Sequence, residues 1–170
     1  MNRILPGTVP RTLPLRAYVV PVASTIAGSA LAALPIVADA PVLPPFGLMM
    51  ALGWRLLRSE IWRAWMALPI GLADDLLTGM PLGSGPIVLT ICFLVFDAMD
   101  TRSIWRDYWQ DWLITAAALA FCMVAGWAIV RFDGGSGSIG LIVPQFAMAI
   151  FCVPLTVRVC AALDAWRLRR

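Results

Sequence analysis

The sequence predicts an all-α, polytopic membrane protein with a single domain of about six transmembrane helices. Hydrophobic residues make up 61% of the 170-residue chain and charged residues only 14%, and the mean hydropathy is +0.83. Soluble globular domains carry about 25% charged residues. The length suffices for about six apolar segments of roughly 20 residues with short connections. We therefore expect one domain.

The expected elements follow one another along this membrane domain, which we place at residues 17–163. A basic, Pro-rich cytoplasmic tail of residues 1–16 precedes it, and a basic cytoplasmic C-terminus of residues 164–170 follows it. Apolar runs that are long enough, or nearly so, to cross a bilayer as helices give six expected spans at residues 17–38, 42–57, 61–79, 82–99, 112–130 and 139–163.

Three of these spans carry local signals of their own. The second opens with Pro44 and Pro45, which are tolerated in a first helical turn. The third has few uncharged residues before an acidic pair, so it could instead be a re-entrant segment that does not cross. The sixth contains Pro144 and Pro154, which should kink it unless neighbouring helices satisfy the freed carbonyl groups.

The distribution of arginine predicts the orientation in the membrane. All 13 basic residues are arginine, and cytoplasmic loops of membrane proteins collect such residues near the span ends. With six spans and both termini in the cytoplasm, only Arg131 lies outside. A five-span arrangement would place the Arg-rich C-terminus outside. Most tryptophans fall near the same inner interface, where indole rings are favoured; these are Trp54, Trp62, Trp65, Trp105, Trp109, Trp112 and Trp166.

Two adjacent carboxylates, Asp74 and Asp75, are the clearest functional signal, because ionisable groups are rare in apolar spans. Helical spacing places Gly71, Asp75 and Gly79 on one face, with Asp74 turned about 100° away. Small residues on that face permit close helix contact. At 1.5 Å rise per residue, Asp75 would lie only about 6 Å from the outer turn after Gly79.

The acidic pair has two possible roles. A carboxylate at this position can accept hydrogen bonds from the exposed amides at the start of the next span, around Leu82 to Gly85, and so fix the hairpin. Paired acids can also bind a cation or relay a proton, but such a site usually needs further polar residues on other spans. Few are available, so the structuring role is favoured.

The segment from Asp97 to Asp111 is expected to contain an amphipathic interfacial helix. Aromatic and aliphatic residues recur in it at helical spacing, with arginines and aspartates among them; the apolar set is Ile104, Trp105, Tyr108, Trp109 and Trp112. A helix lying on the membrane surface is favoured over a docking site for a cytosolic partner. The arginines of the tail can set orientation or contact anionic membrane lipid.

The inventory of reactive side chains argues against several function classes. The chain has no histidine and no lysine, and its four cysteines lie in apolar runs without the spacing of a zinc site. Adjacent aspartates that point in different directions suit neither general acid/base catalysis nor a two-metal site. A nucleic-acid footprint would need a contiguous basic face. We therefore expect no catalytic residues, no metal, no cofactor and no nucleic-acid partner.

Two stretches, residues 54–60 and 71–83, together resemble the rod shape-determining protein MreD family. That family has a short second span ending near W-x-x-x-R, followed by G-L-x-x-D-x-L-x-G-x-P-L-G. The second pattern is matched here by Gly71, Asp75, Gly79, Pro81, Leu82 and Gly83. Two departures are the additional acid at Asp74, where the family is usually apolar, and a longer Pro-rich tail.

The resemblance implies a non-enzymatic, multi-pass component of the bacterial inner membrane that belongs to the cell-elongation complex. Such a protein binds MreC and supports the glycosyltransferase RodA and its transpeptidase, so that peptidoglycan synthesis follows the cell shape. The family is similar in fold to the substrate-capture subunits of vitamin transporters, which gives an alternative function. The short outer loops, poor in polar side chains, count against that alternative. A purely structural small membrane protein is a third possibility.

Overall fold

The computed structural model describes residues 16–32, 43–100, 108–135 and 139–168. These residues form helices and connecting turns and include no strand, which confirms the all-α class. The elements are α1 (Arg16–Ala32), α2 (Phe46–Leu57), the short 3-10 helix η1 (Ala64–Met66), α3 (Ala67–Thr78), α4 (Ser84–Asp100), α5 (Tyr108–Phe132), the short 3-10 helix η2 (Ile139–Leu141) and α6 (Ile142–Leu168).

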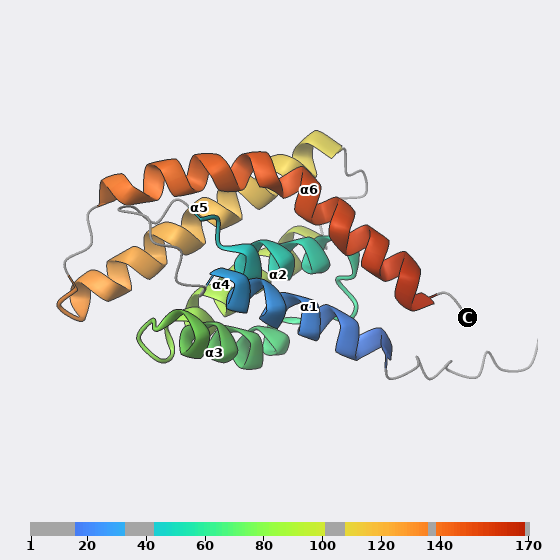
Figure 1. Cartoon of the computed structure of the whole chain (residues 1–170), viewed down its shortest axis with the longest axis horizontal. Coiled ribbons are helices and arrows are strands. Elements are labelled where there is room, and N and C mark those ends of the chain that lie inside the picture. The colour runs from blue at the N-terminus through green and yellow to red at the C-terminus, as the bar shows by residue number, and fades with distance from the viewer. Residues whose placement is uncertain (1–15, 33–42, 101–107, 136–138, 169–170) are drawn as a thin grey trace, which may run out of the picture.

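The helices pack as a bundle in which consecutive helices run in opposite directions (Figure 1). α2 lies in the middle and contacts α1, α5 and α6. α3 pairs with α4 and with α1, while α5 and α6 lie side by side along the opposite flank. This alternation brings the ends of α2, α4 and α6 to one end of the bundle and the turn between α3 and α4 to the other.

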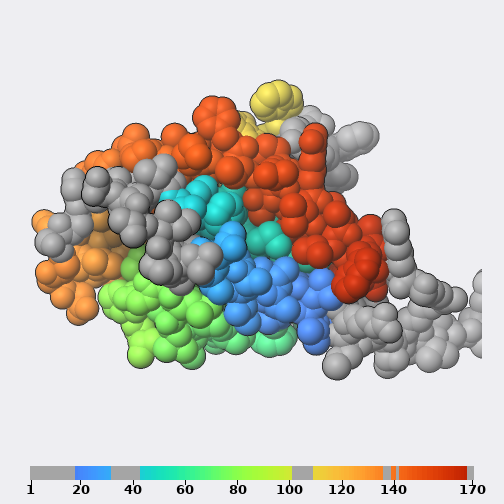
Figure 2. All heavy atoms as spheres, viewed as in Figure 1, coloured from blue at the N-terminus to red at the C-terminus, as the bar shows by residue number. Residues whose placement is uncertain are grey.

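Among the described residues, two helical segments are long and apolar enough to cross a membrane, Trp109–Phe132 and Ile142–Arg167. Their most apolar windows are only 28% and 22% buried, whereas the core helix of a soluble domain is mostly buried. In Figure 2, α6 forms much of the outer surface along one flank. Large exposed apolar side chains on α6 include Val143, Met148, Phe151, Leu155, Val159 and Trp166.

The helices found at the second and third expected spans, α2 and α3, are shorter than those spans. α2 and α3 have 12 residues each, which corresponds to about 18 Å of helix. The segment expected at residues 61–79 is interrupted, because α3 begins only at Ala67. Pro69 explains this start, since proline is tolerated in the first turn of a helix but not in its interior.

The two prolines of the sixth expected span behave differently from each other. Pro144 is the third residue of α6, where a missing N–H breaks no helical hydrogen bond. Pro154 lies near the middle of the helix, and α6 bends along its length in Figure 1. The helix then continues to Leu168, so most of the expected C-terminal tail, residues 164–168, belongs to the bundle.

Two of the tryptophans expected at the membrane interface are buried in the protein instead. Trp54 and Trp62 are fully buried, whereas Trp65, Trp109 and Trp166 are exposed. The indole N–H of Trp54 donates to the Ser24 hydroxyl of α1 at 2.8 Å, and Trp62 packs edge-on against Phe93 with 6.1 Å between ring centroids. These two rings therefore pack inside the bundle rather than on its surface, and their depth in a membrane stays a prediction.

The expected interfacial helix between Asp97 and Asp111 is divided between two longer helices where the structure describes it. Residues 97–100 form the last turn of α4, and Tyr108, Trp109 and Trp112 lie in the first turns of α5. Trp109 and Trp112 pack edge to face at 6.2 Å between centroids. The predicted residues Ile104 and Trp105 lie outside the described residues.

Candidate functional site

The hairpin between α3 and α4 is shaped by two glycines with left-handed backbone conformations. Gly79 caps the C-terminus of α3 with φ 70° and ψ 21°, and Gly83 has φ 100° just before α4. Both conformations disfavour residues with a Cβ atom. Between them, the carbonyl of Pro81 accepts the N–H of Ser84 at 3.1 Å, which closes the turn.

Asp75 lies at the centre of this hairpin and is 2% exposed. Its Oδ2 accepts the N–H of Gly83 at 2.8 Å, and its Oδ1 accepts the N–H of Gly85 at 2.9 Å. The hydroxyl of Ser84 donates to Oδ1 at 3.1 Å. The carboxylate therefore satisfies donors at the start of α4, near the positive end of that helix, as its sequence position suggested.

Close backbone contact between α3 and α4 makes this arrangement possible. A Cβ atom on Gly71 would lie 2.6 Å from the carbonyl carbon of Gly85, and a Cβ on Gly85 would lie 2.7 Å from Oδ1 of Asp75. Either distance is far below van der Waals contact. Gly79 does not share this role, because a Cβ there would meet nothing within 4 Å; its requirement for glycine comes from the backbone angle instead.

The remaining predicted hairpin residues lie away from the Asp75 carboxylate. Asp74 is half-buried and interacts with the Ser29 hydroxyl of α1. Leu82 is 69% exposed, and Pro81 lies in the turn. The structure thus brings together Gly71, Asp75 and Gly83. The two aspartates have different neighbours: Asp75 joins α3 to α4, whereas Asp74 faces α1.

A second polar group, which we call the Arg55 cluster, lies at the opposite end of the bundle. It consists of Arg55, Asp97 and Asp100. The Arg55 side chain is only 1% exposed, and its Nη2 forms ion pairs with Asp97 and, at 3.0 Å, with Asp100. The guanidinium also lies over the Phe96 ring, 5.8 Å from its centroid. This cluster joins the end of α2 to the end of α4.

A third polar group, the Asp164 cluster, joins the end of α6 to the end of α2. Arg58 donates to Oδ2 of Asp164 at 2.7 Å, and Nε of Arg167 donates to Oδ1 at 2.7 Å. The hydrogen bond to Asp164 raises the pKa of Arg58 above its ordinary value, so the pair stays ionised. Arg167 also lies 5.3 Å from the ring centroid of Trp54.

Both arginine clusters were missed by sequence reasoning, which treated Arg55 and Arg58 only as charges that set orientation. The partners of Arg55 and Arg58 are 42 and 106 residues away, beyond the reach of any local pattern. Asp164 and Arg167 do stand three residues apart, the spacing of an ion pair on one helix face. That spacing was the one available signal.

These groups hold helices together. Within the described residues, no group of three or more His, Cys, Asp and Glu side chains is placed to hold a metal ion. The buried carboxylate of Asp75 is occupied by three donors of its own chain. The arrangement fixes the helices relative to one another.

No family model matches the chain, and neither the curated proteins nor the solved structures include a detectable relative.

Proposed function

We propose that this protein is a non-enzymatic scaffold of the bacterial cell-elongation complex in the inner membrane, of the kind that the MreD resemblance implies. One observation carries the proposal. The residues that fit the family pattern, Gly71, Asp75 and Gly83, are those that build the closed hairpin between α3 and α4. The sequence pattern that carries the resemblance therefore coincides with the residues that give this hairpin its shape.

The surface of the bundle supports a placement in the membrane. The two longest helices are apolar and mostly exposed, which water would disfavour and lipid would not. Arg55, Arg58, Arg63 and Arg167 gather toward the end of the bundle formed by the ends of α2, α4 and α6, whereas Arg131 lies in the last turn of α5. We infer six passes with that arginine-rich end in the cytoplasm, where the positive-inside rule would put it.

The two short helices are compatible with this topology. At about 18 Å each, α2 and α3 are shorter than the hydrocarbon core, so the bilayer would thin locally or the adjoining turns would enter the interface. Charged side chains near the C-terminal ends of these helices have partners within the protein: Asp75 of α3 accepts the N–H of Gly85, and Arg55 of α2 pairs with Asp97 and Asp100. Such satisfaction is what backbone and charges near lipid require.

A scaffold acts through the shape of its surface, and the hairpin determines the shape here. The exposed face of α3 carries leucines one helical turn apart, Leu68, Leu72 and Leu76. Asp75 and Gly71, on the adjoining face, hold α3 against α4. We propose that this surface contacts MreC and, through it, RodA and its transpeptidase.

Affinity purification tests the proposal. The tagged full-length chain is extracted from native membranes in mild detergent, and co-purifying proteins are identified by mass spectrometry. Recovery of MreC with the cell-wall synthases is expected. The Asp75→Ala variant should lose these partners when equal amounts of purified protein are compared, and Asp74→Ala is the matched control.

Two results would reject the scaffold proposal. Recovery of the ATPase module of a transporter, with a vitamin that raises the Tm of the purified protein, would replace the scaffold with a substrate-capture subunit. Recovery of neither set, with normal cell shape after depletion of the protein, would also reject the proposal. Rounded cells after depletion are expected if the proposal holds.

A further inference from the structure

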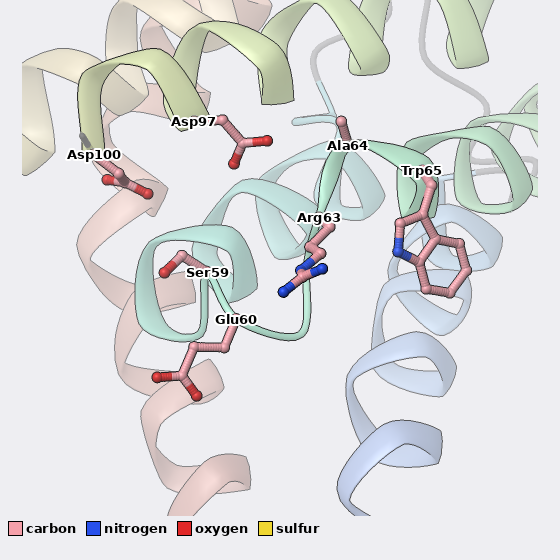
Figure 3. Close-up of a pocket in the computed structure, with 7 residues that line it drawn as sticks. All are labelled: Ser59, Glu60, Arg63, Ala64, Trp65, Asp97 and Asp100. Carbon is pink, nitrogen blue, oxygen red and sulfur yellow. The ribbon is translucent and has the colours of Figure 1, made fainter.

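An open cavity of about 530 Å³ lies at the arginine-rich end of the bundle. It is bounded by the turn after α2, by η1 and by the last turn of α4 (Figure 3). Its lining residues are Ser59, Glu60, Arg63, Ala64, Trp65, Asp97 and Asp100. The cavity therefore combines carboxylates, one arginine and an indole ring in one opening.

Two carboxylates of the cavity, Asp97 and Asp100, are held in place by a buried arginine. Asp97 and Asp100 are held by the guanidinium of Arg55, whose side chain is 99% buried behind them, as its 1% exposure shows. Asp97 remains 44% exposed, and an ionised carboxylate has about four acceptor positions. It thus keeps acceptor capacity toward the opening while its position is fixed.

Arg63 supplies the opposite charge in the same opening. The side chain is exposed, and no carboxylate of the described chain lies within 4.0 Å of it. Glu60 also lines the opening, again without an ion pair among the described residues. Figure 3 shows Glu60, Arg63 and Asp97 around the opening, with Trp65 at its side. An arginine without an ion pair among the described residues, close to Glu60 and to the exposed part of the Asp97 carboxylate, suits a ligand that carries both charges.

The position of the cavity identifies the chemical class of that ligand. Trp65 is 62% exposed, and exposed indole rings favour the level of lipid headgroups. The neighbouring residue Leu68 on α3 is also exposed and apolar, so the cavity borders the surface that would face acyl chains. A ligand with a zwitterionic head and apolar tails fits both parts.

We infer that this cavity binds the headgroup of phosphatidylethanolamine from the cytoplasmic leaflet. The phosphate lies at Arg63, and the primary ammonium group donates hydrogen bonds to Glu60 and Asp97. A choline headgroup has no N–H to donate, and a glycerol headgroup has no positive charge, so both fit less well. The inference rests on the membrane placement proposed above, but not on any protein partner.

Native mass spectrometry of the full-length protein tests this inference. The detergent-purified protein is incubated separately with phosphatidylethanolamine, phosphatidylcholine or phosphatidylglycerol of identical acyl chains, and the retained lipid is measured. We expect one phosphatidylethanolamine to be retained at least about threefold better than either other lipid, the size of effect that one exposed ion pair supplies.

Variants at exposed residues separate this site from general lipid adhesion. Glu60→Gln and Arg63→Gln should each reduce retention of phosphatidylethanolamine by about threefold, without a change in Tm, because neither side chain has an ion-pair partner among the described residues. Arg131→Gln, the same change at the end of α5, should leave retention unchanged. Free phosphoethanolamine should compete only weakly, since it lacks the acyl chains.

Several results would overturn the inference. Equal retention of the ethanolamine and choline lipids would show that the carboxylates do not contact the ammonium group. A preference for phosphatidylglycerol would indicate an anion site at Arg63 alone. Unchanged lipid retention in Glu60→Gln, with loss of a co-purifying protein, would assign the cavity to a basic protein segment. Because these assays use the protein alone, they are independent of whether MreC is recovered.

Discussion

The carboxylate of Asp75 accepts the backbone N–H of Gly85 at 2.9 Å, and this bond joins the last turn of α3 to the first turn of α4. The two residues are ten positions apart in sequence. With the bond from Gly83, the carboxylate accepts two backbone N–H groups that have no intrahelical partner at a helix start, and it also accepts the Ser84 hydroxyl.

Replacement of Asp75 by asparagine should destabilise the protein. The amide keeps one acceptor oxygen but loses the charge and the second oxygen, so at least one buried N–H of Gly83 or Gly85 loses its partner. The expected loss is about 1–3 kcal/mol, seen as a lower Tm in detergent. Asp74→Asn, at the half-buried neighbour, should change stability by less than about 0.5 kcal/mol. Equal effects of the two variants would contradict the assignment.

Replacement of Gly71 by alanine should also destabilise the protein, although alanine is the better helix former. The added methyl group would meet the backbone of Gly85 at 2.6 Å and force α3 away from α4, at a cost of about 1–3 kcal/mol. Gly126→Ala in α5 is the matched control, because its Cβ would meet nothing within 4 Å. That control should be neutral or stabilising by up to about 1 kcal/mol. The Tm values of the two variants in detergent are compared, and an equal Tm for both would contradict the close packing at Gly71.

Replacement of Arg55 by methionine should destabilise the junction of α2 with α4. It would leave Asp97 and Asp100 close together without their cation, at a cost of about 1–3 kcal/mol once the partial exposure of Asp97 is considered. A further Asp97→Asn change in the same protein should recover part of the loss, because it removes the repulsion between the two carboxylates. Chemical denaturation in detergent measures both. Additive effects of the two changes would indicate that the ion pair contributes no coupling.

Replacement of Asp164 by asparagine should loosen the end of α6. Arg58 and Arg167 would each lose a charge-assisted hydrogen bond and would repel one another across the junction. Hydrogen exchange should become faster in residues 160–168 and at the end of α2, while the α3–α4 hairpin stays protected. Arg158→Gln, at an exposed position of α6, provides the control. Uniformly faster exchange would point to global destabilisation instead.

The proposed topology predicts opposite labelling of two exposed positions. In a cysteine-free background, Asp133→Cys at the end of α5 should react with a membrane-impermeant maleimide in spheroplasts. Glu60→Cys, in the turn after α2, should react only after the membrane is permeabilised. Both residues are exposed in the structure, so steric protection does not explain a difference. The reverse pattern would place the arginine-rich end outside.

The sequence predicted the hairpin well and the packing of the bundle poorly, for a physical reason. The bonds of Asp75 span at most ten residues, so helix capping and the αL preference of glycine suffice to anticipate them. The Arg55 and Arg58 pairs depend on which helices become neighbours, and apolar runs carry little information on that. The burial of the Trp54 indole could not be anticipated for the same reason: its partner Ser24 lies 30 residues away on α1.

The contrast between local and distant pairs also has a consequence for synthesis under the proposed membrane topology, because it bears on how the chain would be inserted. The hairpin of α3 and α4 contains both the acceptor and the donors that Asp75 requires, so the two helices can insert together as a unit with that charge already satisfied. Arg55 has no such provision within α2. Its partner Asp97 is synthesised 42 residues later. This order favours retention of α2 beside the translocation machinery until α4 has been made.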